Sequence, residues 1–102
     1  MPTIAQLKKL LTLDPNDPFV HYGLGQEHAS VGDHEQAIAC YDKVLELDPE
    51  YLYAYFFKGQ ALHDSGKTDE AKLVIQSGIE AARKINDGHA ASELSGLLDS
   101  IT

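Results

Sequence analysis

Three short runs of the sequence match parts of motifs that carry chemistry. Residues 61–68 end in Ser-Gly-Lys-Thr like a phosphate-binding loop, but they lack its first glycine and lie between two segments with helical patterns. Residues 23–25, Gly-Leu-Gly, start a dinucleotide-binding fingerprint whose third glycine is replaced by His28. Residues 34–35, His-Glu, begin like a zinc-protease helix, yet Ile38 stands where the second histidine ligand is required. We therefore predict neither a nucleotide site nor a zinc-protease site from these runs.

The remaining candidates for chemistry are single side chains. His21 and His28 lie about two turns apart on one face of a predicted helix and could share a metal ion, but no carboxylate or cysteine completes a site by its spacing. The preferred interpretation is that both rings fill half-buried packing positions. Cys40, the only cysteine, has no activating base at a fixed spacing and excludes an intrachain disulfide. We expect no catalytic residue, metal or cofactor; a metal protein or enzyme that uses His21, His28 and His63 is the least favoured alternative.

The charge balance limits the partners. The 102-residue chain has 16 acidic and 8 basic residues, a net charge of −8, and no run of more than two lysines or arginines. Nucleic acids and anionic lipids are bound through clustered basic side chains, so neither is an expected partner. The acidic surface favours a basic partner or serves solubility alone.

Because the sequence has neither a signal-peptide pattern nor an apolar run of about 20 residues, we expect no membrane segment and a cytoplasmic location.

The elements that must position these side chains follow a repeat. The run Leu-x-Leu-Asp-Pro ends at Pro15 and again at Pro49, 34 positions later. Three more residues recur at the same offset, namely Gly25, Gly32 and Ala37, as Gly59, Gly66 and Ala71. A fixed period of this length indicates one supersecondary unit stacked on copies of itself. Such a scaffold presents a surface rather than a catalytic pocket.

Nearly the whole chain has the 3–4 spacing of apolar residues that predicts helices. Pro15 and Pro49 end their helices because the residue before a proline is pushed out of the helical region. Glycine-containing turns separate the others, and Asp17 and Asp33 are predicted N-caps. No segment alternates apolar and polar residues over strand length. The predicted helices cover residues 3–13, 18–31, 34–47, 52–64, 68–86 and 89–101.

This arrangement resembles the tetratricopeptide repeat family. The family pattern places a Leu-Gly pair and an aromatic residue on a first helix, followed by a turn glycine, an alanine, an aromatic residue and a closing proline. The first copy, residues 18–51, matches it at Leu24, Gly25, Gly32, Ala37, Tyr41 and Pro49. The second copy, residues 52–85, matches it at Tyr55, Gly59, Leu62, Gly66, Ala71 and Gly78. The chain departs from the pattern at His21, His28, Lys58 and Arg83.

The resemblance implies an all-α fold, a right-handed α-solenoid of antiparallel helix pairs that form a superhelix like that of tetratricopeptide repeats. We expect residues 1–102 to be a single domain of that kind. A half-repeat helix would cover residues 3–17, the two repeats would cover residues 18–51 and 52–85, and a C-terminal capping helix would cover residues 86–102. The terminal helices would close the ends of the stack.

The resemblance also implies a function and a site. In this family the first helices of successive repeats line a concave groove. The groove residues carried over are Phe19, Tyr22, Gln26, Ser30, Tyr53, Phe56, Phe57, Gln60 and Asp64. We expect a non-catalytic protein–protein interaction scaffold whose groove binds a peptide or helix of a partner, with aromatic anchors and with Gln26 and Gln60 pairing to its backbone. Capture of a C-terminal carboxylate is not expected, because Tyr22 and Gln26 occupy the positions of the lysine and asparagine that hold it.

A second expectation is self-association. The predicted helix over residues 3–13 has no preceding neighbour in the repeat pattern. Its apolar residues Ile4, Leu7 or Leu11 could then complete a homodimer.

Overall fold

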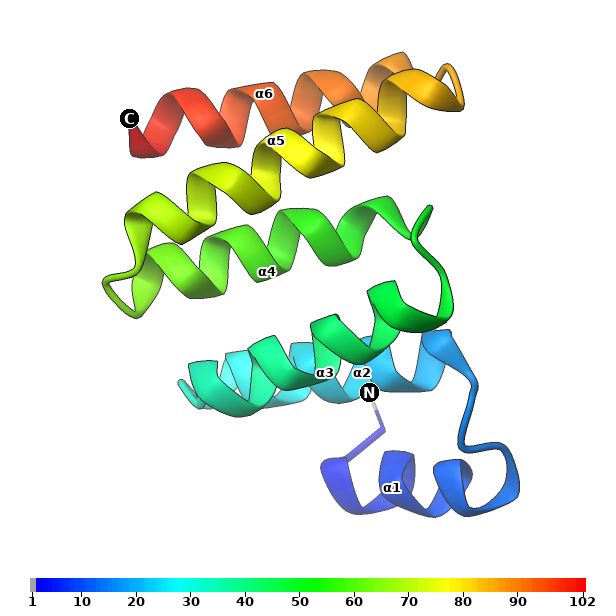
Figure 1. Ribbon diagram of the computed structural model, residues 1–102. Coiled ribbons are helices and arrows are strands. Elements are labelled where there is room, and N and C mark those ends of the chain that lie inside the picture. The colour runs from blue at the N-terminus through cyan, green and yellow to red at the C-terminus, as the bar shows by residue number, and fades with distance from the viewer. Residues whose placement is uncertain (1) are drawn as a thin grey trace.

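Within residues 2–102, six α-helices follow one another in a layered stack (Figure 1). The computed structural model describes residues 2–102. The helices are α1 (Ile4–Leu13), α2 (Pro18–Ser30), α3 (His34–Leu47), α4 (Leu52–Asp64), α5 (Thr68–Lys84) and α6 (Gly88–Ile101). No strand occurs among residues 2–102. Helix α1 lies at one end of the stack, and α5 and α6 lie at the other (Figure 1).

Side-chain caps fix where several helices begin. The Asp17 carboxylate accepts a hydrogen bond from the Phe19 N–H at 3.0 Å, and the Asp33 carboxylate accepts one from the Gln36 N–H at 3.2 Å. Both caps were predicted, and each satisfies an N–H that has no partner within its helix. Thr3 is the N-cap of α1, not its first residue, and forms a reciprocal capping box with Gln6.

Two turns of similar geometry join α2 to α3 and α4 to α5. Gly32 has φ +79° and Gly66 has φ +87°, a left-handed conformation that glycine adopts without a steric penalty. The N–H of the following residue then reaches back to the helix, from Asp33 to the His28 carbonyl at 2.9 Å and from Lys67 to the Leu62 carbonyl at 2.8 Å. The recurrence of Gly32 and Gly66 in the sequence therefore reflects a repeated helix-ending motif.

The predicted ends of two segments were wrong by one or two residues. Helix α5 ends at Lys84, because Asn86 has φ 60° and leaves the right-handed helical region. Asp87 then caps α6, which begins at Gly88, and its carboxylate accepts from the Ala90 N–H at 3.0 Å. Helix α2 ends at Ser30, just before the residue predicted.

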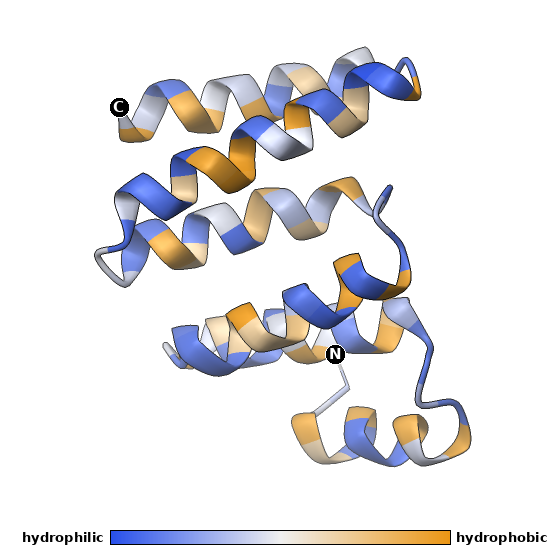
Figure 2. Ribbon diagram, viewed as in Figure 1, coloured by the Kyte–Doolittle hydropathy of each residue, from blue (hydrophilic) through white to orange (hydrophobic). Residues whose placement is uncertain are grey.

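The core is a series of apolar clusters along the stack. Leu7 of α1 packs with Val20 and Leu24 of α2. A second cluster joins α3 to α4, and the largest joins α4, α5 and α6 around Ile75 and Leu94. Apolar and hydrophilic stretches alternate along the helices (Figure 2), and apolar residues form clusters where neighbouring helices pack. No helix among residues 2–102 is both long and apolar enough to cross a lipid bilayer.

Candidate binding groove between α2 and α4

Two exposed aromatic side chains occupy equivalent positions at the starts of α2 and α4. Phe19 is 69% exposed and Tyr53 is 48% exposed, and their numbers differ by the repeat length of 34. The Asp17 cap holds the backbone at Phe19. Phe19 and Tyr53 therefore present apolar ring surface to solvent, where a partner can contact it.

A group of aromatic rings, of which Tyr41 is fully buried and the others are half-buried, connects α2, α3 and α4. The centre of the Tyr22 ring lies 5.1 Å from that of Tyr51, 6.1 Å from that of Phe57 and 6.2 Å from that of Tyr41. Phe57 in turn meets Phe56 edge-on at 5.1 Å. These separations and tilts are those of favourable aromatic pairs. The rings therefore stabilise the stack as well as forming part of its surface.

The pKa of the Tyr22 phenol is raised by its surroundings. Burial first, and then the nearby Tyr51 and Tyr53 phenols, raise the pKa of Tyr22 to about 12. The side chain is therefore neutral at any physiological pH.

Phe56 packs against the large apolar cluster of α4, α5 and α6, so only part of its ring is available to a ligand.

A cavity of about 310 Å³ opens where the C-terminal halves of α2 and α4 approach α3. It brings together five of the nine residues predicted for the groove: Gln26, Ser30, Phe57, Gln60 and Asp64. The other four, Phe19, Tyr22, Tyr53 and Phe56, are not among its lining residues. The candidate site thus has an aromatic part at the N-terminal ends of α2 and α4 and a polar cavity toward their C-terminal ends.

Four residues that line the cavity were not among the groove residues predicted from the sequence: Ala29, His34, Tyr41 and Ala61. Tyr41 is fully buried, and its hydroxyl donates a hydrogen bond to Oε1 of Gln26. Burial raises the pKa of Tyr41 well above its ordinary value, with smaller contributions from Tyr22 and Cys40. The hydroxyl therefore remains a donor and fixes the Gln26 side chain.

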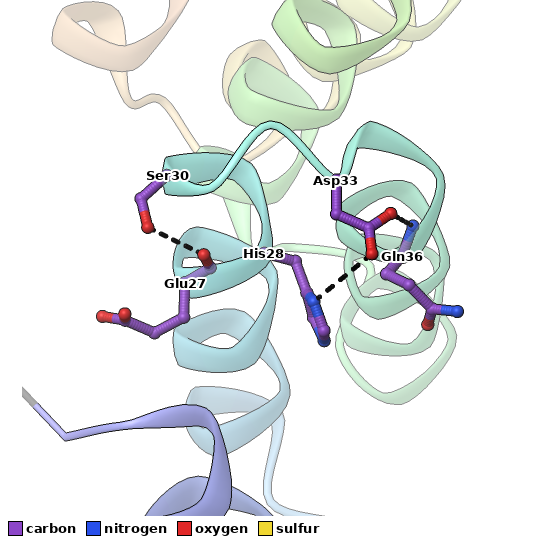
Figure 3. Close-up of polar contacts among 5 residues, drawn as sticks. All are labelled: Glu27, His28, Ser30, Asp33 and Gln36. Atoms are coloured by element: carbon purple, nitrogen blue, oxygen red, sulfur yellow. Dashed lines mark hydrogen bonds and ion pairs between the residues drawn. The ribbon is translucent and has the colours of Figure 1, made fainter.

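The polar side chains of this cavity offer acceptors from Ser30, Gln60 and Asp64, beside the amide N–H donors of Gln26 and Gln60. The Ser30 hydroxyl donates its hydrogen to the Glu27 carbonyl at 2.7 Å (Figure 3), which leaves the Ser30 oxygen free to accept. Asp64 adds a carboxylate at the last turn of α4. No lysine or arginine lines the cavity. Lys58, the only lysine of α4, instead pairs with Asp42 of α3 at 2.5 Å.

The histidines considered as metal ligands lie at separate turns. Nε2 of His21 lies 2.8 Å from the Pro15 carbonyl, and Nδ1 of His28 lies 4.0 Å from the Asp33 carboxylate (Figure 3). His63 contacts the Thr68 hydroxyl at 3.0 Å. Within residues 2–102, no three histidine, cysteine or acidic side chains are grouped closely enough to hold a metal ion.

The single thiol is also engaged in packing. Cys40 packs against the apolar cluster of Leu7, Val20 and Leu24. Burial, the largest effect, raises the pKa of the Cys40 thiol. The thiolate is the nucleophilic form, so burial makes this side chain a poor nucleophile.

Of the three residues predicted for self-association, Leu7 is buried, whereas Ile4 and Leu11 are half-buried, and self-association through α1 stays a prediction. Leu7 is 5% exposed, and Ile4 and Leu11 pack on the same cluster against α2. The apolar stripe of α1 is thus used inside the molecule. The exposed leucines of α1 are Leu10, 45% exposed, and Leu13, 82% exposed.

Comparison with known proteins agrees with this architecture. The family model described as tetratricopeptide repeat matches residues 18–51, and a second model of the same description matches residues 52–85. A tetratricopeptide repeat domain protein from Salinibacter ruber, solved in solution, is 33% identical and superimposes with a TM-score of 0.79. That comparison covers 86% of this chain and 89% of the other. The chain belongs to the tetratricopeptide repeat family, and the predicted all-α solenoid of antiparallel helix pairs is confirmed.

Full-length relatives differ widely in size. A repeat-containing protein of Pseudomonas aeruginosa is 26% identical over 95 residues, which is 93% of this chain and 90% of that protein. Superkiller protein 3 of Saccharomyces cerevisiae is 31% identical over 80 residues, but these cover 78% of this chain and only 6% of that protein. The chain spans less than half of the length of several curated relatives, so their whole-protein activities do not transfer with the match.

Two further solved structures share the fold at low identity. The complex of the TPR2B domain of yeast Sti1 with pHsp70 superimposes with a TM-score of 0.90 at 20% identity, over 96% of this chain and 78% of the other. PcrH in complex with the chaperone binding region of PopD superimposes with a TM-score of 0.87 at 22% identity, over 96% of this chain and 74% of the other.

Proposed function

We propose that this protein is a protein-interaction scaffold whose α2–α4 face binds a segment of a partner protein. The observation that carries the proposal is the pair of exposed aromatic residues, Phe19 and Tyr53, at equivalent repeat positions on the two helices whose C-terminal halves line a polar cavity. The structures of Sti1 and PcrH, which share this fold, are complexes with pHsp70 and with the chaperone binding region of PopD. They support the proposal by fold alone.

The two parts of the site suit different parts of a bound segment. Phe19 and Tyr53 offer large, rigid apolar surfaces, which commonly supply most of the binding energy of an interface. Gln60 is exposed and makes no side-chain hydrogen bond within residues 2–102, so its amide can pair with a backbone N–H or C=O of the segment. Gln26 is held by Tyr41 and keeps its amide nitrogen as a donor.

The test is a double variant, Phe19→Ala with Tyr53→Ala. Both side chains are exposed, so circular dichroism and the urea midpoint should be unchanged, while binding of segments selected from a displayed library of random peptides should weaken at least about tenfold. Leu73→Ala is the matched control, because Leu73 is an equally exposed apolar residue on α5. Undiminished binding by the double variant would rule out the α2–α4 face.

A second candidate function is self-association through α1. Leu10 and Leu13 are exposed beside a cavity of about 560 Å³ that Pro2, Gln6 and Lys9 also line. Sedimentation velocity across a wide dilution series would show a concentration-dependent dimer that Leu10→Ser with Leu13→Ser removes. A monomer at every concentration would exclude this candidate without affecting the first.

A further inference from the structure

The polar cavity between α2, α3 and α4 has features that select one kind of side chain. We infer that it receives a lysine or arginine side chain of the bound partner segment, and this inference rests on the function proposed above. The relevant cavity residues are Ser30, Phe57, Gln60 and Asp64. Each of them contributes something that a cation requires.

Hydrogen-bond polarity is the first argument. The Ser30 hydroxyl and the Tyr41 hydroxyl have both given their only hydrogen to protein acceptors, the Glu27 carbonyl and Gln26 Oε1. Tyr41 is fully buried, so of these two oxygens only that of Ser30 is accessible to a ligand, and it can only accept. Asp64 is an acceptor as a carboxylate, and Gln60 has a free amide oxygen. An ammonium or guanidinium group is a donor without acceptors, so it matches this set.

Charge is the second argument. Among residues 2–102, Asp64 forms no ion pair, and it is the last residue of α4. A carboxylate there faces the negative end of the helix dipole, which is an unfavourable position. The equivalent residue of the first repeat, Ser30, is neutral. A cation from a partner would compensate a charge that the fold itself leaves without a counterion.

Shape and surroundings are the third argument. The Phe57 ring forms part of the lining, and the face of an aromatic ring attracts a cation. Lys67, three residues after Asp64 in the sequence, lines a different cavity that shares only His34 with this one. The His34 Nδ1 atom is shielded from solvent and has no protein partner within residues 2–102. In the neutral ring this nitrogen can accept or donate, according to the tautomer.

The test begins with a displayed library of random peptides selected on the intact protein. The selected peptides should be enriched in lysine or arginine at a constant distance from an aromatic or aliphatic residue. A synthetic copy of one of them is then compared with its analogue in which norleucine replaces the basic residue. Fluorescence anisotropy should show the analogue binding about tenfold more weakly, since hydrogen bonds to charged groups are among the strong ones.

Two protein variants of equal net charge separate a local contact from general attraction. Asp64→Asn should weaken binding of the basic peptide about tenfold and leave binding of the norleucine analogue unchanged. Glu80→Gln lies at an exposed position of α5 outside the cavity and should change the affinity for either peptide by less than about twofold. Equal effects of the two variants would overturn the cavity assignment.

The outcomes also distinguish this inference from the proposed function. Selected peptides that are neutral or acidic, yet lose binding to the Phe19→Ala with Tyr53→Ala variant, would overturn the cation site and leave the binding face intact. Peptides that bind this variant undiminished, or a library that yields no binder, would overturn both.

Discussion

Gly25 is the residue that most directly controls how closely α2 and α3 approach. A Cβ atom at this position would lie 2.5 Å from Cε1 and 2.9 Å from Cδ1 of the fully buried Tyr41 ring. We expect Gly25→Ala to lower the free energy of unfolding by about 1–2 kcal/mol, because overpacking outweighs the gain in helix propensity. Urea unfolding would measure the change.

The matched control is Gly96→Ala in α6, where an added Cβ meets no atom within 4 Å. At that position only the higher helix propensity of alanine acts, so the free energy of unfolding should rise by about 0.5–1 kcal/mol. If both alanine variants were stabilising, the close approach at Gly25 would not exist in solution.

Tyr22 makes the stability of the protein depend on pH in the alkaline range. The pKa of Tyr22 is about 12 in the folded protein against an ordinary value of 10.0, so the unfolded chain loses this proton at a lower pH than the folded protein. The stabilisation is fully present below pH 10 and is lost as the pH rises toward 12. The urea midpoint should therefore fall more steeply over this interval in the wild type than in Tyr22→Phe. Equal slopes would contradict the burial of the phenol.

At the residue scale, the repeat predicts which positions face a common surface but not how deeply each side chain is buried. Gln26, Gln60 and Asp64 could be placed because equivalent helix positions share a face. Tyr41 could not be placed at the cavity, because its hydroxyl reaches Gln26 only after Gly25 lets α3 approach α2. The binding role of all these residues stays a prediction.

At the element scale, α1 is the helix whose attachment depends on the fewest residues. It has ten residues and one buried side chain, Leu7, which packs on Val20 and Leu24. A helix of this length is marginal without tertiary contacts. Leu7→Ala should lower the free energy that holds α1 on α2 by about 2–5 kcal/mol, so α1 should separate from α2. Hydrogen exchange should then lose protection in residues 4–13 first.

The rest of the stack provides the internal control for this variant. The α4–α6 cluster around Ile75 and Leu94 shares no residue with the α1–α2 cluster, so amides of these helices should keep their protection. Leu13→Ala, at an exposed position of the same helix, should change neither region. Uniform loss of protection along the chain would show that the stack unfolds as one unit.

The helices could be predicted from the sequence because prolines, glycines and capping aspartates mark their ends. The exceptions are informative. Asn86 adopts φ 60° and ends α5 without glycine or proline, a conformation that asparagine adopts more readily than most residues. The apolar stripe of α1 was visible, but whether it faced α2 or a second copy depended on packing that a one-dimensional pattern does not contain.

At the scale of the whole molecule, the chain is a short stack in which each helix contacts its neighbours, and its acidic charge is spread over that stack. The net charge is −8, and the only lysine ion pairs within residues 2–102 are Lys43 with Glu46 and Lys58 with Asp42. The radius of gyration is 13.4 Å. Carboxylates on different helices therefore repel one another over distances comparable with the Debye length, about 30 Å at 0.01 M and about 8 Å at 0.15 M salt.

Screening this repulsion should stabilise the folded protein. We expect the melting temperature to rise by a few degrees between those two salt concentrations, since about 1 kcal/mol corresponds to roughly 4–8 °C in a domain of this size. Glu80→Lys changes the net charge from −8 to −6, because it removes one negative charge and adds one positive charge. The melting temperature of this variant should therefore rise less with added salt. A melting temperature that fell with added salt would mean that favourable ion pairs outweigh the repulsion.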